Sequence, residues 1–216
     1  MNEELPMVDA TWFTTMEDAT QRLAPGDAYD QLTRRFFTSN PSGEIRMNQL
    51  VLLALLVRMN GLHQGTLREL ANDNPHAVWP LMRAYFELEV AMLYISRHPQ
   101  YLMSLAEKPS GDNLGAPALP KMTTMLRAVK DVIPAGADAY RQLSDIAHPG
   151  VLATWSGHTV SLNDDGSLLL QWSPHPRFRP EQLPIAAAQL EELILGTQGT
   201  FIKLAEHHLA VVPESQ

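Results

Sequence analysis

The chain has 216 residues, of which 45% are hydrophobic and 19% are charged, and its formal net charge is −8. This composition is typical of a globular protein with a sizeable core, and it excludes a wholly disordered chain. The acidic balance argues against a domain that coats nucleic acid through bulk electrostatics, so we expect no bulk DNA binding. The absence of cysteine excludes disulfides, thiolate metal ligands and a cysteine nucleophile.

Targeting signals are absent from the N-terminal residues of this sequence. The first ten residues, MNEELPMVDA, are acidic and lack the basic and apolar regions of a signal peptide. The longest apolar run, LVLLALLV at residues 50–57, is shorter than the ~18–20 residues that span a membrane. We therefore expect a cytoplasmic protein without a membrane partner, and the lack of cysteine fits a reducing compartment.

Apolar residues recur at helical spacing along most of the chain. The predicted helices, in chain order, are residues 8–23, 27–38, 44–72, 76–99, 100–107, 121–133, 137–148 and 184–210. The stretches rich in proline and glycine between them, such as residues 39–43 and 109–120, are typical of turns and loops. These patterns predict a mainly all-α helical bundle that forms a single domain over residues 1–216.

The pattern changes at residues 159–172. Residues 159–162 alternate between polar and apolar, residues 163–166 have the composition of a turn, and residues 167–172 resemble a second strand. We interpret this segment as a β-hairpin inserted between helices rather than as a domain boundary.

The helix over residues 76–99 carries charges inside an otherwise apolar sequence. Because it is apolar around nearly its whole circumference, it is expected to be a central helix surrounded by others. Arg83 and Glu87 are four residues apart on one face, and Glu89 follows. A lone buried charge is very costly, so these side chains must be paired or neutralised.

A second polar feature lies in the segment YRQLSDIAHP at residues 140–149. Arg141 and His148 are seven residues apart and share one side of a helix with Ser144, while Asp145 lies at its edge and Tyr140 at the boundary. This stripe is either a solvated helix face or one part of a functional site. Equally, Arg83 with Glu87 is either a structural ion pair or a group that reaches His148 and sets its charge.

Two strings in these helices resemble the motifs of a bacterial family of uncharacterised helical proteins. They are Arg-x-x-x-Glu at residues 83–87 and Tyr-x-x-Leu-Ser-x-x-x-His-Pro at residues 140–149. That family is in turn distantly similar to the HEPN class of helical domains. Many HEPN members are metal-independent ribonucleases that carry an Arg followed, after four to six residues, by a His on one helix. The resemblance covers about residues 75–150, and it implies catalytic roles for Arg141, His148 and Ser144.

Two classes of function follow from these observations. The resemblance implies a metal-independent endoribonuclease of toxin or defence type, in which His148 takes a proton and Arg141 stabilises charge on phosphate. The alternative is a non-catalytic helical module that binds a small ligand, a nucleotide or a protein. Its polar cluster would comprise Arg83, Glu87, Arg141 and His148, supported by Tyr140 and Asp145.

Partners and cofactors follow from the same patterns. A homodimer is expected from the resemblance and from apolar stripes in excess of one core, with RNA or a small ligand as the other candidate partner. The sequence has no Gly-rich phosphate loop, no metal-binding His-Glu helix motif and no nucleophile elbow. We therefore expect neither a metal nor a cofactor.

Overall fold

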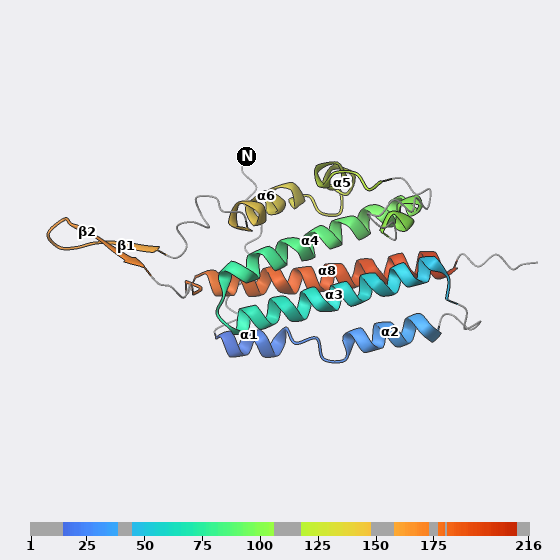
Figure 1. Ribbon diagram of the computed structural model, residues 1–216, viewed down its shortest axis with the longest axis horizontal. Coiled ribbons are helices and arrows are strands. Elements are labelled where there is room, and N and C mark those ends of the chain that lie inside the picture. The colour runs from blue at the N-terminus through green and yellow to red at the C-terminus, as the bar shows by residue number, and fades with distance from the viewer. Residues whose placement is uncertain are drawn as a thin grey trace, which may run out of the picture. The chain divides into compact units, whose positions relative to one another are not determined.

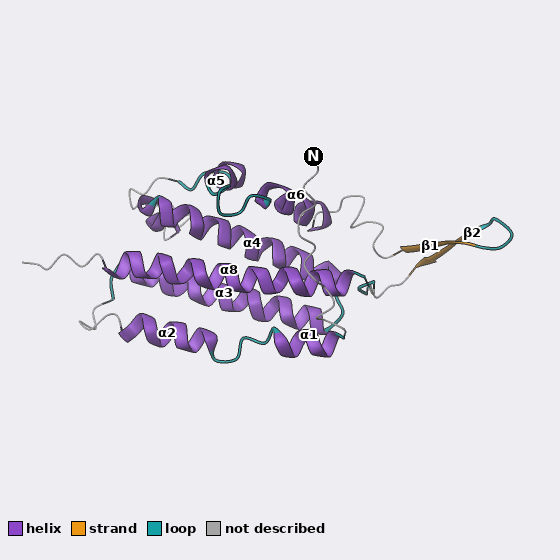
Figure 2. Cartoon of the chain, turned by 180° about the vertical axis from the view of Figure 1, so that it is seen from behind, coloured by secondary structure: helices purple, strands orange, loops and turns teal. Residues whose placement is uncertain are grey.

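The computed structural model describes residues 15–38, 45–105, 118–147, 158–172, 177–179 and 181–210. The expected mainly helical fold is confirmed, with a β-hairpin as its minor part (Figures 1 and 2). The α-helices are α1 (Met16–Arg22), α2 (Ala28–Thr38), α3 (Met47–Ala71), α4 (Pro75–Arg97), α5 (Met122–Ala128), α6 (Gly136–Ala147) and α8 (Gln182–Ala210). A 3-10 helix, η2 (Pro99–Leu105), follows α4, and the strands are β1 (His158–Leu162) and β2 (Leu168–Trp172).

The first two helices begin and end where local chemistry dictates. The side chain of Thr15 caps α1 by accepting a hydrogen bond from the backbone N–H of Asp18 at 3.0 Å. Gly26, in the turn before α2, has a φ of +51°, a conformation that glycine adopts without steric cost. The predicted helix over residues 8–23 is observed from Met16, because residues 1–14 lie outside the described part of the chain.

The turn between α3 and α4 is stabilised by one aspartate. Asp73 has a φ of +55°, and Pro75 then opens α4, where its missing N–H costs nothing. The carboxylate of Asp73 accepts a hydrogen bond from the backbone N–H of Phe178 at 2.8 Å. The ring of Phe178 packs edge-on against Trp79, so this turn is held by both polar and aromatic contacts.

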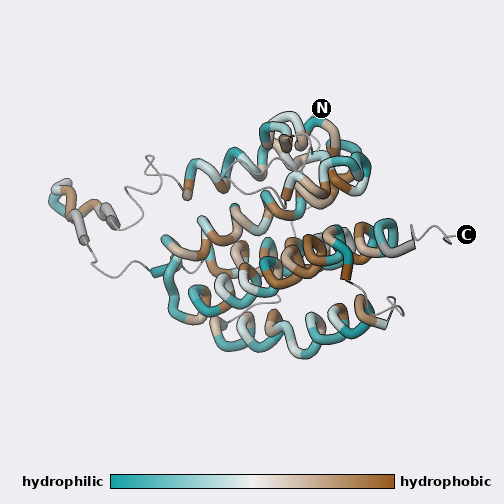
Figure 3. The backbone as a smooth tube through the Cα atoms, turned by 45° about the vertical axis from the view of Figure 1, so that its right-hand side comes forward, coloured by the Kyte–Doolittle hydropathy of each residue, from teal (hydrophilic) through white to brown (hydrophobic). Residues whose placement is uncertain are grey.

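Helix α4 is mostly buried, as its apolar sequence predicts. Buried side chains cover most of its circumference, from Val78 through Tyr85 and Val90 to Ile95. Its three charged residues in this region are half-buried rather than exposed. Figure 3 shows apolar stretches, in brown, alternating with hydrophilic ones, in teal, along the long helices.

The prediction of one helix over residues 121–133 is wrong at its C-terminal end. Helix α5 stops at Ala128 and the chain continues through turns to Gly136. The guanidinium of Arg97 donates a 2.7 Å hydrogen bond to the carbonyl of Ala128, which satisfies a helix-terminal acceptor from outside the helix. Arg97 also makes a two-armed ion pair with Asp131 that holds the turn.

The hairpin predicted for residues 159–172 is confirmed. The strands pair antiparallel, with Leu162 opposite Leu168, and Gly166 adopts a φ of +80° in the turn. Asp165 accepts hydrogen bonds from both the backbone N–H and the hydroxyl of Ser167, at 2.8 and 2.6 Å. These two bonds lower the pKa of the Asp165 carboxyl below its ordinary value.

The chain divides into two compact units. The first contains residues 1–24, 64–84 and 138–192, and the second contains residues 25–63, 85–137 and 193–216. In the second unit, α2 lies beside α3 and α8, as both views show (Figures 1 and 2). The single-domain organisation expected from the sequence stays a prediction.

Candidate functional site

Helix α6 carries most of the residues that the sequence singles out. Gly136 begins it at a place where a Cβ would lie 3.0 Å from the Cγ2 of Ile133, so any other residue there would require Ile133 to shift by a few tenths of an ångström. Leu143 is buried on one face, and the opposite face carries Arg141 and Asp145, both exposed. This arrangement is that of an amphipathic helix lying on the surface of its unit.

The two polar strings of the sequence meet at Arg83 and Tyr140. The Arg83 guanidinium donates a 3.1 Å hydrogen bond to the Tyr140 hydroxyl, and its Cζ lies 5.3 Å from the centre of the ring. Both residues are half-buried. The contact combines a hydrogen bond with a cation–π interaction, so it fixes α6 against the first part of α4 (Figures 1 and 2).

Arg141 has a different environment from that of Arg83. Its side chain is 70% exposed, and its guanidinium lies 3.0 Å from the carboxylate of Asp138, one turn earlier on α6. An exposed ion pair of this kind contributes little and opens easily in water. The guanidinium is therefore accessible to an anionic ligand.

Ser144 does not share this exposure, although the sequence places it on the same side of the helix. Its Oγ is buried, and no residue that the structure describes provides a hydrogen-bond partner for it. The two side chains are 60° apart around the helix axis, since three residues turn an α-helix by about 300°. The expected continuous stripe is thus divided into an exposed arginine and a shielded hydroxyl.

The remaining predicted residues are placed only in part. His148 lies outside the described residues, one position beyond the end of α6. Glu87 is half-buried on α4, one helical turn after Arg83. The structure thus brings together Arg83 and Tyr140 and leaves Arg141 facing solvent.

Sequence patterns did not reveal a second polar cluster, which lies inside the second compact unit. The hydroxyl of Tyr29 on α2 lies 3.1 Å from Nδ1 of His63 on α3 and 3.1 Å from the hydroxyl of Tyr85 on α4. All three side chains are at least 95% buried. We call Tyr29, His63 and Tyr85 the buried triad.

Helix α8 completes the surroundings of the buried triad. Gln198 lies near the hydroxyl of Tyr29 and Thr197 near that of Tyr85, and each partly offsets the effect of burial on the pKa of that tyrosine. Burial raises the pKa of both tyrosine hydroxyls, so both stay protonated at neutral pH. The hydrogen bonds of the buried triad can run in either direction, because each tyrosine hydroxyl both donates one hydrogen bond and accepts others.

Glu89 reaches the backbone of α8 beside this cluster. A Cβ on Gly196 would overlap Oε1 of Glu89 and lie 3.1 Å from its Cδ. The glycine therefore leaves the space that the carboxylate occupies. The carboxylate also contributes to the raised pKa of Tyr85, although less than burial and Tyr29 do.

A signal for the buried triad was present in the sequence. His63 lies in line with Met59, Thr66 and Leu70 on the face of α3 that points into the core. A polar residue at such a position needs a partner, which periodicity can indicate but cannot identify.

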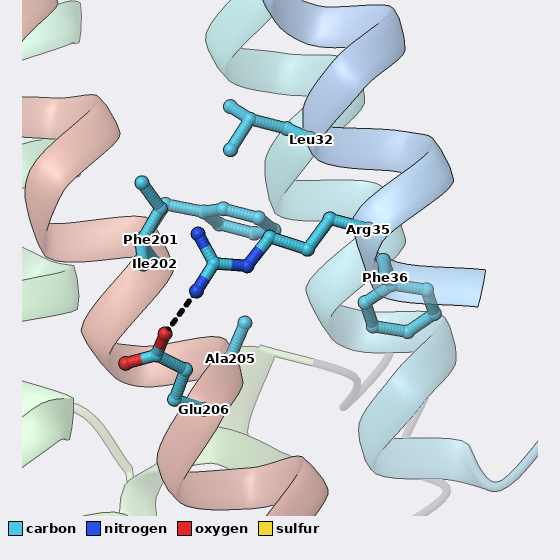
Figure 4. Close-up of a pocket in the computed structure, with 7 residues that line it drawn as sticks. All are labelled: Leu32, Arg35, Phe36, Phe201, Ile202, Ala205 and Glu206. Atoms are coloured by element: carbon cyan, nitrogen blue, oxygen red, sulfur yellow. Dashed lines mark hydrogen bonds and ion pairs between the residues drawn. The ribbon is translucent and has the colours of Figure 1, made fainter. Parts of the chain in front are cut away.

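A small pocket lies between α2 and α8 (Figure 4). Its volume is about 30 Å³, and it is lined mainly by apolar side chains that include Phe36 and Phe201. Arg35 and Glu206 form an exposed ion pair at its edge. The pocket holds about one water molecule and is too small for a nucleotide or a substrate.

Comparisons with family models, curated proteins and solved structures found no match to this chain. Among the described residues, no group of three or more histidine, aspartate or glutamate side chains is placed to hold a metal ion. In the same part of the chain, α3 alone is long and apolar enough to cross a membrane, and it is partly buried among the other helices. A core helix of a soluble protein has these same properties.

Proposed function

We propose that this protein is a HEPN-like, metal-independent endoribonuclease that uses Arg141 and His148. The observation that carries the proposal is the exposed guanidinium of Arg141 on a helix fixed in place through Tyr140. An arginine in this setting can bind a phosphodiester with two hydrogen bonds, because its pair with Asp138 is weak. A bacterial, cytoplasmic toxin or defence protein is the corresponding biological role.

The proposed chemistry needs only groups of the chain and the RNA itself. His148 accepts the proton of a ribose 2′-hydroxyl, and the 2′-oxygen attacks the adjacent phosphorus. The bond from phosphorus to the 5′-oxygen breaks, which leaves a 2′,3′-cyclic phosphate, and the released 5′-oxygen takes up a proton from water to become a 5′-hydroxyl. Arg141 stabilises the negative charge that grows on the phosphate oxygens.

Cleavage of structured RNA in the presence of EDTA tests this proposal. We expect the wild-type protein to cut, and Arg141→Ala and His148→Ala to lose at least about 100-fold in rate, the range for a general acid–base group. Arg127→Ala is the matched control, because Arg127 is an exposed arginine on α5 that the mechanism does not use. Failure of the wild type to cut, or equal cutting by all variants, refutes the ribonuclease proposal.

The second candidate function is a non-catalytic module that binds a nucleotide or another small ligand at the same cluster. The buried Oγ of Ser144, which has no partner among the described residues, favours it because a shielded hydroxyl is suited to hydrogen-bonding a ligand. Arg83 and Glu87 would support such a site from α4. Binding of a fluorescent nucleotide that Arg141→Ala weakens, without any cleavage of RNA, is the result that selects this function.

A further inference from the structure

Helix α3 has an apolar surface on the side that faces away from the core of its unit. Its core-facing side chains include Leu52 and Met59, which are fully buried. On the opposite side, Met47, Leu50 and Val57 are 51%, 46% and 72% exposed. Ala54 and Gly61 continue this side, so the outer face consists of Met47, Leu50, Ala54, Val57 and Gly61. The exposed Arg58 lies beside it, and the exposed Arg68 follows it two turns later. A helix of a monomeric protein normally has polar side chains on such a face.

The spacing of this outer face is that of a helix that packs against another helix. Its members follow one another at intervals of three, four, three and four residues. This alternation is the 3.5-residue period of a coiled-coil seam, in which side chains of one helix fit between those of the next. Arg46 and Arg58 lie at the edges of the face, and its centre carries no charge.

We infer that the outer face of α3 binds the same face of a second copy of this chain in antiparallel orientation. In that orientation a register exists in which Leu50 lies opposite Gly61 of the second copy and Val57 opposite Ala54. Each large side chain then meets a small one, and the two-fold axis makes both contacts twice. A parallel pair would instead place Leu50 against Leu50 and Gly61 against Gly61, which fills space less evenly.

The space at Gly61 supports this register. A Cβ on Gly61 would have nothing within 4 Å, so its surface is open in the single chain. Gly61 lies in the interior of a 25-residue helix, where glycine is destabilising by roughly 1 kcal/mol relative to alanine. Close approach of a second helix explains a glycine at an otherwise unfavourable position.

The area of the face agrees with what a dimer needs. Met47, Leu50 and Val57, together with the neighbouring Ile45, which is 47% exposed, leave on the order of 400 Å² of apolar surface, a size found for interaction patches on protein surfaces. A standard interface buries about 800 Å² on each partner and is about 65% apolar in homodimers, or roughly 520 Å² of apolar surface. The stems of Arg46 and Arg58 can supply most of the remainder.

The molecular mass of the full chain in solution tests this inference. We expect light scattering at tens of micromolar to give twice the 24.1 kDa mass of the chain. Val57→Glu and Gly61→Leu should each shift the mass to that of a single chain, with an unchanged helical circular dichroism spectrum because both positions are exposed. Val132→Glu is the control, since Val132 is an equally apolar, 51% exposed side chain outside the face.

Disulfide formation tests the orientation directly, because the natural sequence has no cysteine. A mixture of Leu50→Cys and Gly61→Cys proteins should cross-link under mild oxidation, and Leu50→Cys alone should not. Cross-linking of Leu50→Cys with itself would overturn the antiparallel register, since a disulfide needs Cα atoms within about 7 Å.

A monomeric wild type, or a Val57→Glu variant that remains dimeric, overturns the interface. Flotation of the wild type with anionic phospholipid vesicles, abolished by Val57→Glu, would assign the face to a membrane surface and would also overturn it. The inference does not depend on ribonuclease activity, because it rests on α3 and its readouts are mass and cross-linking.

Discussion

Replacing Gly196 with alanine tests how closely Glu89 packs against α8. In an open helical position the change from glycine to alanine stabilises by about 1 kcal/mol. At Gly196 the new Cβ would overlap Oε1 of Glu89, so the carboxylate must leave its place. The carboxylate is the far end of a flexible, half-buried side chain, so moving it costs about as much as the alanine gains, roughly 1 kcal/mol. We expect Gly196→Ala to leave the free energy of unfolding nearly unchanged.

Gly199→Ala is the matched control on the same helix. It lies less than one turn further along α8, it is half-buried like Gly196, and a Cβ there would have nothing within 4 Å. This variant should gain the full helix propensity, about 1 kcal/mol. Urea unfolding followed by tryptophan fluorescence measures both variants, and we expect their free energies of unfolding to differ by about 1 kcal/mol.

A double-mutant cycle identifies the cause of that difference. In a Glu89→Ala background the overlap is gone, so Gly196→Ala should become as stabilising as Gly199→Ala to within about 0.5 kcal/mol. If Gly196→Ala stabilises the original protein as much as Gly199→Ala does, Glu89 does not occupy the space beside α8.

Two further predictions concern a buried and an exposed interaction. Tyr29→Phe should destabilise by about 2–3 kcal/mol and Tyr85→Phe by about 1 kcal/mol in urea titrations, because the Tyr29 hydroxyl lies within hydrogen-bond distance of both His63 and Tyr85. Equal losses would contradict this order. Hydrogen bonds from Arg97 lower the pKa of the Asp131 carboxyl below its ordinary value of 3.8. The ionised carboxylate therefore stabilises the fold above pH 3.8, and this stabilisation is lost as the pH falls through the lowered pKa. Asp131→Asn should therefore lower the thermal midpoint at pH 7 and approach the wild-type midpoint below pH 3.8; a pH-independent difference would contradict the ion pair as its cause.

The sequence predicted the helices well because their apolar residues recur at one period over many turns. The hairpin was predictable for a related reason, since its turn residues and alternating strands are local signals. The end of α5 was not predictable. At this end Arg97 donates a hydrogen bond to the carbonyl of Ala128 from 31 residues earlier in the chain, and no local pattern reports such a contact.

The candidate site was predictable only in its composition. The strings around Arg83 and Tyr140 indicated polar groups on two helices, and the structure shows that these two side chains meet. Whether a polar side chain faces solvent or the interior depends on which neighbour covers it. The exposed Arg141 and the shielded Ser144 illustrate this, although they are three residues apart. The buried triad was not predictable from the sequence, because its members come from three different helices.

The hairpin described above has a consequence for hydrogen exchange. In a sheet of two strands each strand is an edge, so half of the backbone amides point outward without a partner in the sheet. Leu162 and Leu168, which face each other across the strands, are largely exposed, and an isolated hairpin of this size is only marginally stable. Its amides should therefore exchange with deuterium through local opening that costs little free energy, while those of the buried part of α4 exchange only on global unfolding.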